Sequence, residues 1–152
     1  MVEQLDRIVD EVEALHSKLV LLITAGGTRK SPLLHALAQR RSAEVLNIGS
    51  VLGARLAALP VKQRALAVPE ELRDLVDKHA VNGLVLLDNL ELLFDRSLRL
   101  NPLDLLKQIA RARRVVAVWP GQQRAGRLTY AEMGHPEHQD YGIDGLVPLE
   151  IQ

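Results

Sequence analysis

The chain has 152 residues, 47% hydrophobic and 25% charged, so it is long and apolar enough for one globular domain with a sizeable core. Its 19 basic and 19 acidic side chains cancel, which excludes a global charge that would attract nucleic acid or a membrane surface. A nucleic-acid contact would need a local basic patch such as Arg111, Arg113 and Arg114. Because the chain has no cysteine, no signal-peptide pattern and no apolar run of about 18 residues, we expect a soluble cytoplasmic protein.

Hydrophobic periodicity divides the chain into alternating helices and strands. Apolar residues at helical spacing predict amphipathic helices, the first of them in the acidic N-terminal segment 1–18. Short apolar runs such as LVLLIT and GLVLLD predict strands that are buried on both faces, as in parallel sheets. In chain order we expect a helix at 3–17, a strand at 19–24, a helix at 31–41, a strand at 44–49, helices at 50–59 and 69–80, a strand at 83–88, a helix at 102–112, and strands at 114–119 and 145–151.

Prolines and turn residues set several of these boundaries. Pro60 is expected to end one helix and Pro69 to open the next, whose first turn is acidic as the helix dipole favours. Residues 120–145 are rich in glycine and polar residues, with one short β-like piece, RLTYA, and are expected to form a loop-rich insertion before the last strand. Pro148 in that strand indicates an edge position or an irregularity.

The loop after the first strand has the outline of a phosphate-binding P-loop, because it joins a buried strand to a helix and ends in Lys-Ser. In such a loop the backbone N–H groups wrap the phosphates, the lysine bridges the outer phosphates, and the hydroxyl holds Mg²⁺. The predicted nucleotide-binding residues are Thr24, Ala25, Gly26, Gly27, Thr28, Arg29, Lys30, Ser31 and Pro32.

Two of these residues depart from the usual pattern, since Thr24 and Arg29 stand where it has glycine. A left-handed backbone at Arg29 would cost about 1–2 kcal/mol, or about 5–30-fold in affinity. Its guanidinium, however, is a good phosphate partner. A plain glycine turn with a surface lysine is the alternative interpretation.

The run LVLLD predicts the other half of a nucleotide site. It ends in Asp88, and in P-loop enzymes of the extended-strand type a carboxylate at this place binds Mg²⁺ through water. The predicted Mg²⁺ residues are therefore Ser31 and Asp88, with a helix cap or turn as the alternative role of Asp88. Hydrolysing members usually have glutamate next, whereas Asn89 is a neutral amide that can orient water but accept no proton. Glu91 is the candidate base if the backbone turns there, and hydrolysis is expected to be slow or to depend on a partner.

Residues near the fourth strand complete the candidate set. Trp119 occupies a place where such enzymes often carry a polar residue that touches the γ-phosphate, and it is expected to pack rather than to sense. Arg124 is a candidate arginine finger acting on a neighbouring subunit, with Arg127, Arg96 and Arg99 as alternatives; each can also be an ordinary surface arginine.

A metal site is not expected in the C-terminal segment. His135 and His138 have ligand-like spacing, with Glu137 and Asp140 close by. Pro136 and the flanking glycines indicate a turn, however, and the sequence offers no third ligand.

The peptides DNLELLF, VVAVWPG and GRLTYAEMGHPEH, in this order after the P-loop, resemble the BrxF family, the small P-loop proteins of type III BREX phage-defence systems. The resemblance covers nearly the whole chain. It implies an AAA-like core that serves as an accessory ATPase in discriminating self from foreign DNA. The implied partners are the other BREX components: a DNA methyltransferase, a large ATPase, a helicase and a phosphatase-like protein. It places the phosphate loop at 24–31 and the Mg²⁺ contact at Asp88.

The expected fold is one domain, residues 1–152: a three-layer α/β P-loop NTPase core of the extended-strand (ASCE), AAA-like type, with a mostly parallel five-stranded sheet and no separate lid domain. We expect it to bind ATP or a related nucleotide with Mg²⁺. Because a lidless core leaves the nucleotide exposed, a homo-oligomer is expected to close the site; DNA contact would be indirect, and no membrane contact is expected. The rival readings are a non-hydrolysing switch or adaptor and, less favoured without an acceptor-binding domain, a small-molecule kinase.

Overall fold

The computed structural model describes residues 1–24, 31–124, 127–130, 139–142 and 145–151. The helices are α1 (Val2–Glu11), α2 (Ser31–Arg41), α3 (Ile48–Ala57), α4 (Val61–His79) and α5 (Pro102–Ile109), with short 3₁₀ helices η1 (Val12–Ala14), η2 (Leu90–Phe94) and η3 (Arg96–Leu98). The strands are β1 (Leu19–Thr24), β2 (Val45–Asn47), β3 (Leu84–Asp88), β4 (Arg114–Val118), β5 (Gln122–Arg124), β6 (Arg127–Tyr130), β7 (Gln139–Gly142) and β8 (Val147–Ile151). Within these ranges, no helix is both long and apolar enough to cross a membrane.

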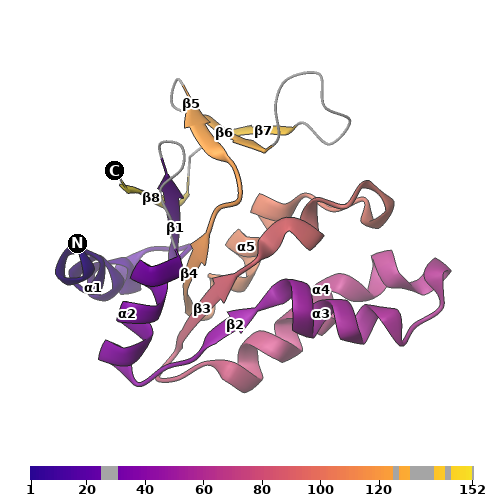
Figure 1. Ribbon diagram of the computed structural model, residues 1–152, viewed down its shortest axis with the longest axis horizontal. Helices are drawn as coiled ribbons and strands as arrows, with labels where there is room; N and C mark the ends of the chain where they lie inside the picture. Colours follow the sequence, from indigo (N-terminus) through magenta and orange to yellow (C-terminus); the bar gives the residue numbers. More distant parts are fainter. Residues whose placement is uncertain (25–30, 125–126, 131–138, 143–144, 152) are drawn as a thin grey trace.

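The main sheet has five strands in the order β2-β3-β4-β1-β8, and all its pairings are parallel (Figure 1). In the centre, Leu21 of β1 is in register with Ala117 of β4 and Pro148 of β8. β4 therefore lies between β1 and β3. This inserted strand, β4, is the extra strand of the expected extended-strand class. Pro148 lies on an edge strand, where its missing N–H breaks no ladder between two neighbours.

Helices cover both faces of this sheet and make it the middle of three layers (Figure 1). Successive strand side chains point to opposite faces. On β1, Val20 and Leu22 pack with α1 and α2, whereas Leu19, Leu21 and Ile23 pack with α3, α4 and α5. All five side chains are completely buried. This two-sided burial explains why the strand has no polar residue before its end.

Several predicted boundaries were wrong: the first helix, expected at 3–17, ends at Glu11, and the helix expected at 102–112 ends at Ile109. α4 begins at Val61, not at Pro69, and Pro69 lies inside the helix. The residues before it, VKQRALA, are mostly good helix formers, and burial of Val68 and Leu72 against the core on either side of the proline outweighs the lost backbone bond. The second strand ends at Asn47, because the Asn47 side chain accepts a hydrogen bond from Ser50 N and so caps α3.

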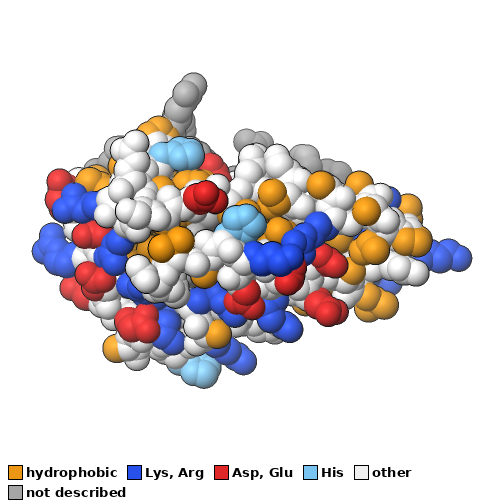
Figure 2. Space-filling model, turned by 90° about the horizontal axis from the view of Figure 1, so that it is seen from below, with side chains coloured by type: hydrophobic (Ala, Val, Ile, Leu, Met, Phe, Trp, Pro, Cys, Tyr) orange, Lys and Arg blue, Asp and Glu red, His pale blue; other side chains and the backbone are white. Residues whose placement is uncertain are grey.

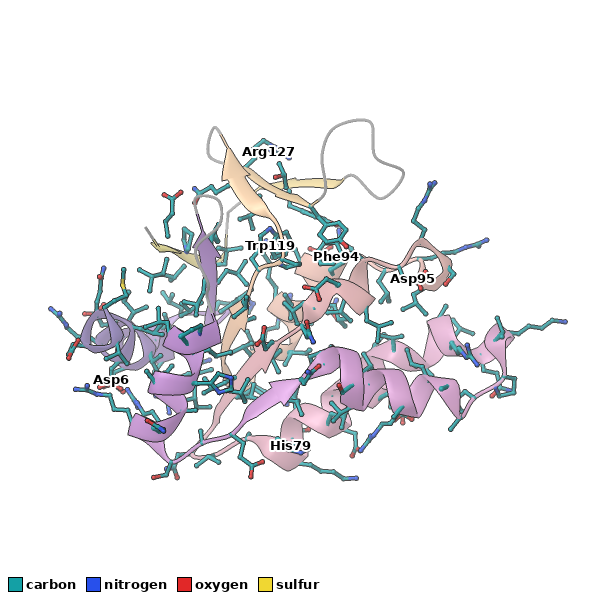
Figure 3. The ribbon with its side chains drawn as sticks, in the orientation of Figure 1. Asp6, His79, Phe94, Asp95, Trp119 and Arg127 are labelled. Carbon is teal, nitrogen blue, oxygen red and sulfur yellow. The ribbon has the colours of Figure 1, made fainter. Side chains whose placement is uncertain are left out.

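The segment 120–145 contains a second, antiparallel sheet in the order β5-β6-β7. Of its strands, the sequence pattern anticipated only β6. The chain's one phenylalanine, one tryptophan and two tyrosines all meet where this sheet joins the core. Phe94 stacks on Tyr130 with ring centroids 4.0 Å apart, and Trp119 meets Phe94 and Tyr141 edge-on at 5.3 and 5.7 Å. The aromatic cluster thus fastens the small sheet to the core (Figure 3).

Candidate nucleotide site at the carboxyl edge of the sheet

The carboxyl ends of the five parallel strands lie along one edge of the main sheet, where open α/β sheets bind ligands. β1 ends there at Thr24, and α2 begins at Ser31, so the unpaired N–H groups of the first turn of α2 lie on this side. Pro32 is the exposed second residue of that helix. The predicted phosphate contacts of Ala25, Gly26, Gly27, Thr28, Arg29 and Lys30 lie outside the described residues.

Asp88 is the last residue of β3 and is half-buried at the same edge. Its Oδ1 accepts a hydrogen bond of 2.8 Å from Asn89 N. Its register partner on β2 is Asn47, and β4 separates it from β1. A carboxylate and a serine hydroxyl are oxygen ligands of the kind that Mg²⁺ prefers, so the donor set of Asp88 and Ser31 fits this ion.

Asn89 has a left-handed backbone, with φ 59° and ψ 57°, which asparagine adopts more readily than most residues. Its carbonyl oxygen accepts a bond from Gly49 N at 3.1 Å, and its side-chain Nδ2 donates to Asn47 Oδ1 at 3.2 Å. Because Asn47 Oδ1 also accepts from Ser50 N, the atom of Asn47 in this contact must be the oxygen and the atom of Asn89 the NH₂ group. The Asn89 amide is therefore held by its donor end.

Asn47 was missed by the sequence reasoning. The signal was present, because EVLN ends in a polar residue just as LVLLD does, and the ends of parallel strands share an edge. What the sequence did not contain was the strand order that makes Asn47 the neighbour of Asp88.

Glu91 lies in η2, just after the left-handed turn at Asn89, so the backbone does turn where its predicted role requires. Its side chain is exposed and makes no hydrogen bond or ion pair with the described part of the chain. The role of Glu91 as a base stays a prediction.

Trp119 packs, as expected. It is fully buried, and its Nε1 donates to the carbonyl oxygen of Thr129 at 3.0 Å. Arg124 lies in β5, where its backbone is in register with Arg127 of β6. Arg96 and Arg99 are exposed at η3 and at its C-cap. None of these positions tests the arginine-finger prediction.

Two other groups of residues stood out in the sequence: the histidines of the C-terminal segment and the basic run 111–114. His135 and His138 lie outside the described residues, and within those residues no cluster of three metal-ligating side chains exists. Two arginines of the basic run make ion pairs: Arg113 with Asp77 at 2.7 Å, and Arg114, the first residue of β4, with Asp10 and Glu13 at 3.5 and 3.2 Å. Arg113 and Arg114 therefore hold helices to the sheet and do not form a free basic patch with the exposed Arg111. Figure 2 likewise shows acidic and basic side chains interspersed over much of one face.

Comparison with known proteins identifies the fold. No protein-family model and no curated protein matches the chain. The solved structure of C. elegans PCH-2 is similar with a TM-score of 0.53 and 15% identity over 99% of this chain and 41% of PCH-2. A DNA replication initiation factor is similar with a TM-score of 0.50 and 18% identity over 99% of this chain and 45% of that protein. This chain thus spans less than half of either protein, and the likeness shows that it has the fold of a P-loop NTPase core, with a parallel five-stranded sheet between two layers of helices.

Proposed function

We propose that the chain binds ATP or a related nucleotide with Mg²⁺ at the carboxyl edge of the main sheet and hydrolyses it slowly. The observation that carries the proposal is a juxtaposition. The P-loop-like segment runs from the end of β1 into the start of α2, and Asp88 ends β3 on the same edge, with only β4 between the two strands. Phosphates favour helix N-termini, and Mg²⁺ favours carboxylate oxygens.

In this proposal each residue has a defined task. The backbone of the segment 24–31 and Lys30 hold the phosphates, while Ser31 and Asp88 hold the cation. Bound Mg²⁺ would neutralise charge on the phosphates. Asn89, held by Asn47, orients a water molecule through its amide but cannot take the proton from it. Slow turnover follows from that last step, unless Glu91 or a partner protein supplies the base.

The first experiment titrates the purified protein with Mg-ATP and measures binding and phosphate release, with Lys30→Ala as the control. Binding that Lys30→Ala abolishes is the expected result. Failure of the wild-type protein to bind Mg-ATP, alone and with partner proteins present, would contradict the proposal.

A second candidate is a non-hydrolysing nucleotide switch or adaptor, and the Asn47–Asn89 amide pair favours it. Both side chains are neutral, so neither supplies a carboxylate base beside Asp88. Binding without phosphate release above the level of Lys30→Ala would select the switch over the slow ATPase.

We further propose, from the resemblance of the peptides named above, that the chain acts as an accessory component of a type III BREX phage-defence system. Co-purification with the methyltransferase, large ATPase, helicase and phosphatase-like protein of such a system is the expected result. Phage resistance that is unchanged when this chain is deleted from an intact system would contradict it. A molecular mass measured with and without Mg-ATP tests the accompanying proposal that a homo-oligomer closes the site.

A further inference from the structure

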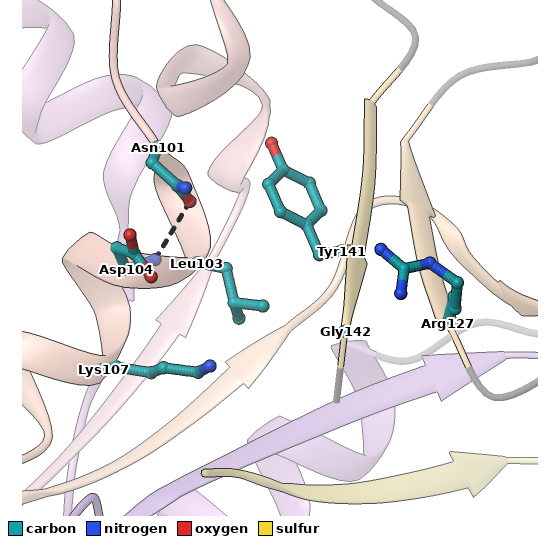
Figure 4. A pocket seen from close by; sticks show the side chains of 7 residues that line it. All are labelled: Asn101, Leu103, Asp104, Lys107, Arg127, Tyr141 and Gly142. Atoms are coloured by element: carbon teal, nitrogen blue, oxygen red, sulfur yellow. Dashed lines mark hydrogen bonds between the residues drawn. The ribbon is translucent and has the colours of Figure 1, made fainter. Parts of the chain in front are cut away.

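A cavity of about 300 Å³ lies between α5 and the β6–β7 hairpin, outside the predicted nucleotide site (Figure 4). Its volume equals that of about ten water molecules at roughly 30 Å³ each, which places it at the small end of ligand pockets. The described residues that line it are Asn101, Leu103, Asp104, Lys107, Arg127, Tyr141 and Gly142. Their side chains are mostly polar, so a ligand must be small and polar as well.

Among the described residues that line this cavity, side chains with hydrogen-bond donors outnumber those with only acceptors. Lys107 and Arg127 are cations from two different elements, α5 and β6, and Asp104 is the only carboxylate among the described residues of the lining. Asn101 Oδ1 already accepts the bond of 3.2 Å from Asp104 N that caps α5, so the free end of this amide is its NH₂ group. Such an excess of donors suits a ligand that carries acceptor oxygens and negative charge.

Two glycines bring the backbone close to both cations. A Cβ on Gly145 would lie 3.7 Å from Lys107 Cε, and one on Gly142 would lie 3.9 Å from Arg127 Nη1. Lys107 is half-buried, and its ammonium makes no hydrogen bond or ion pair with the described residues. An ammonium on a half-buried side chain that is in no ion pair with the described residues favours the binding of an anion.

Tyr141 adds a polar atom that lacks a partner. Its hydroxyl is buried and has no hydrogen-bond partner among the described residues. Burial, with a smaller contribution from the Asp104 carboxylate, raises the pKa of Tyr141 to about 12. The hydroxyl therefore keeps its proton at all physiological pH values and can donate a hydrogen bond to an acceptor atom of a ligand.

We propose that this cavity is a second ligand site, for a small organic anion whose carboxylate or phosphate group lies between Lys107 and Arg127. Its occupation can be followed through Trp119, the chain's single tryptophan, whose ring lies 5.7 Å from that of Tyr141. Tyr141 thus links the cavity to a spectroscopic probe that the protein already carries.

The test titrates lactate and, separately, glycerol phosphate into the protein while Trp119 fluorescence is recorded, with sodium chloride at equal ionic strength as the blank. The Lys30→Ala background is used throughout, so that binding of a phosphate at the P-loop does not obscure the result. A saturable change with a dissociation constant of about 1 mM or tighter is expected for at least one anion. Lactate alone would identify a carboxylate ligand, and glycerol phosphate alone a phosphate ester.

Three variants locate the binding. Lys107→Gln should weaken it about tenfold or more, because a charge-assisted hydrogen bond is lost. Lys62→Gln, an exposed lysine on α4 outside the cavity lining, should leave it unchanged. Tyr141→Phe should weaken it about threefold and yet raise the melting temperature, since a purely structural hydroxyl would affect stability only. No saturable change with either anion, or undiminished affinity in both Lys107→Gln and Tyr141→Phe, would overturn the proposal.

Discussion

Two amide side chains, those of Asn47 and Asn89, limit the chemistry that the carboxyl edge of the main sheet can support. Asn89 stands directly after Asp88, and its Nδ2 is held by Asn47 Oδ1, which also caps α3. The pair is therefore anchored to a helix start as well as to two strands. An amide fixed in this way can orient water but cannot remove its proton.

Replacing Asn89 with glutamate should supply the missing base. Asn89→Glu is expected to raise phosphate release from Mg-ATP by about 10²-fold, the lower end of what a positioned general base contributes. Asn89→Gln is the matched control, because it has the same length without the charge. Both variants should lose about 1 kcal/mol of stability, since the left-handed backbone at this position favours asparagine. Equal turnover in the two variants would contradict this account of Asn89.

Tyr141 makes the stability of the protein depend on alkaline pH. Its pKa of about 12 in the folded state lies above the value of about 10 in an unfolded chain. Because the folded-state pKa is raised, the contribution of Tyr141 to the free energy of unfolding has its full value below about pH 10. This contribution falls as the pH rises from about 10 to 12, since the unfolded chain ionises first. Urea unfolding across this range should show the free energy of unfolding falling, with a smaller fall in Tyr141→Phe. Equal slopes for the two proteins would show that Tyr141 does not titrate as proposed.

Among the elements, the small sheet of β5, β6 and β7 depends on a close approach between the backbone just after β4 and the backbone of β6. Trp119 Nε1 binds Thr129 O, and Gly121 passes so near that a Cβ there would lie 1.6 Å from the same oxygen. The contacted atom belongs to the backbone, so no side-chain rotation can make room. The Trp-Pro-Gly sequence thus combines a tryptophan side chain that anchors β6 with a glycine, whose missing side chain lets the two backbones come close.

Gly121→Ala should push β6 away from the end of β4 and destabilise the protein by about 1–3 kcal/mol. Gly53→Ala in α3 is the matched control. There a Cβ would lie 3.9 Å from Leu92 Cδ2, an ordinary contact, and alanine is the better helix former by about 1 kcal/mol. Urea unfolding followed by Trp119 fluorescence should separate the two substitutions in sign. An unchanged midpoint for Gly121→Ala would mean that β6 can shift without cost.

At the scale of the whole molecule, the N-terminal helix α1 closes one face of the sheet. It buries Leu5 and Val9 completely, and Arg41 of α2 binds its acidic side. Arg41 Nε lies 2.6 Å from Asp6 Oδ1, and its Nη2 lies 3.0 Å from Asp10 Oδ1. Both apolar burial and this ion-pair cluster hold α1 in place (Figure 3).

The Asp6–Arg41 pair should make α1 docking sensitive to acid. The hydrogen bond from Arg41 lowers the pKa of Asp6 below its ordinary value of 3.8. Its stabilisation is therefore present above pH about 4 and lost as the pH falls through the lowered pKa. Asp6→Asn should cost less than about 1 kcal/mol at neutral pH, because the pair is partly exposed, and should match the wild type at an acidic pH below that lowered pKa.

Urea unfolding at both pH values measures this difference. Glu11→Gln is the control, since Glu11 is exposed on the same helix and has no ion pair with the described residues. A difference between Asp6→Asn and the wild type that persists in acid would mean that Asp6 acts through something other than its charge.

Much of this architecture was predictable because local rules and tertiary burial agree. LVLLIT, GLVLLD and RVVAV are apolar on both sides, and only the interior of a parallel sheet between two helical layers buries both sides. Pro69 broke the local rule, because a packed helix face can absorb an interior proline that an isolated helix could not. β5 and β7 were missed because their polar sequences carry no two-residue alternation and they pair only through β6.

By itself, the sequence determined the three-layer fold, the order of its main elements and the presence of Asp88 at a strand end, since each depends on residues close together in the chain. The tertiary structure alone decided which side chains meet. It placed Asn47 beside Asp88, drew all four aromatic rings into one cluster, and set Lys107 of α5 opposite Arg127 of β6. Those contacts join residues that are about 20 to 50 positions apart in the chain. Strand order and layer packing, which no short-range pattern encodes, determine them.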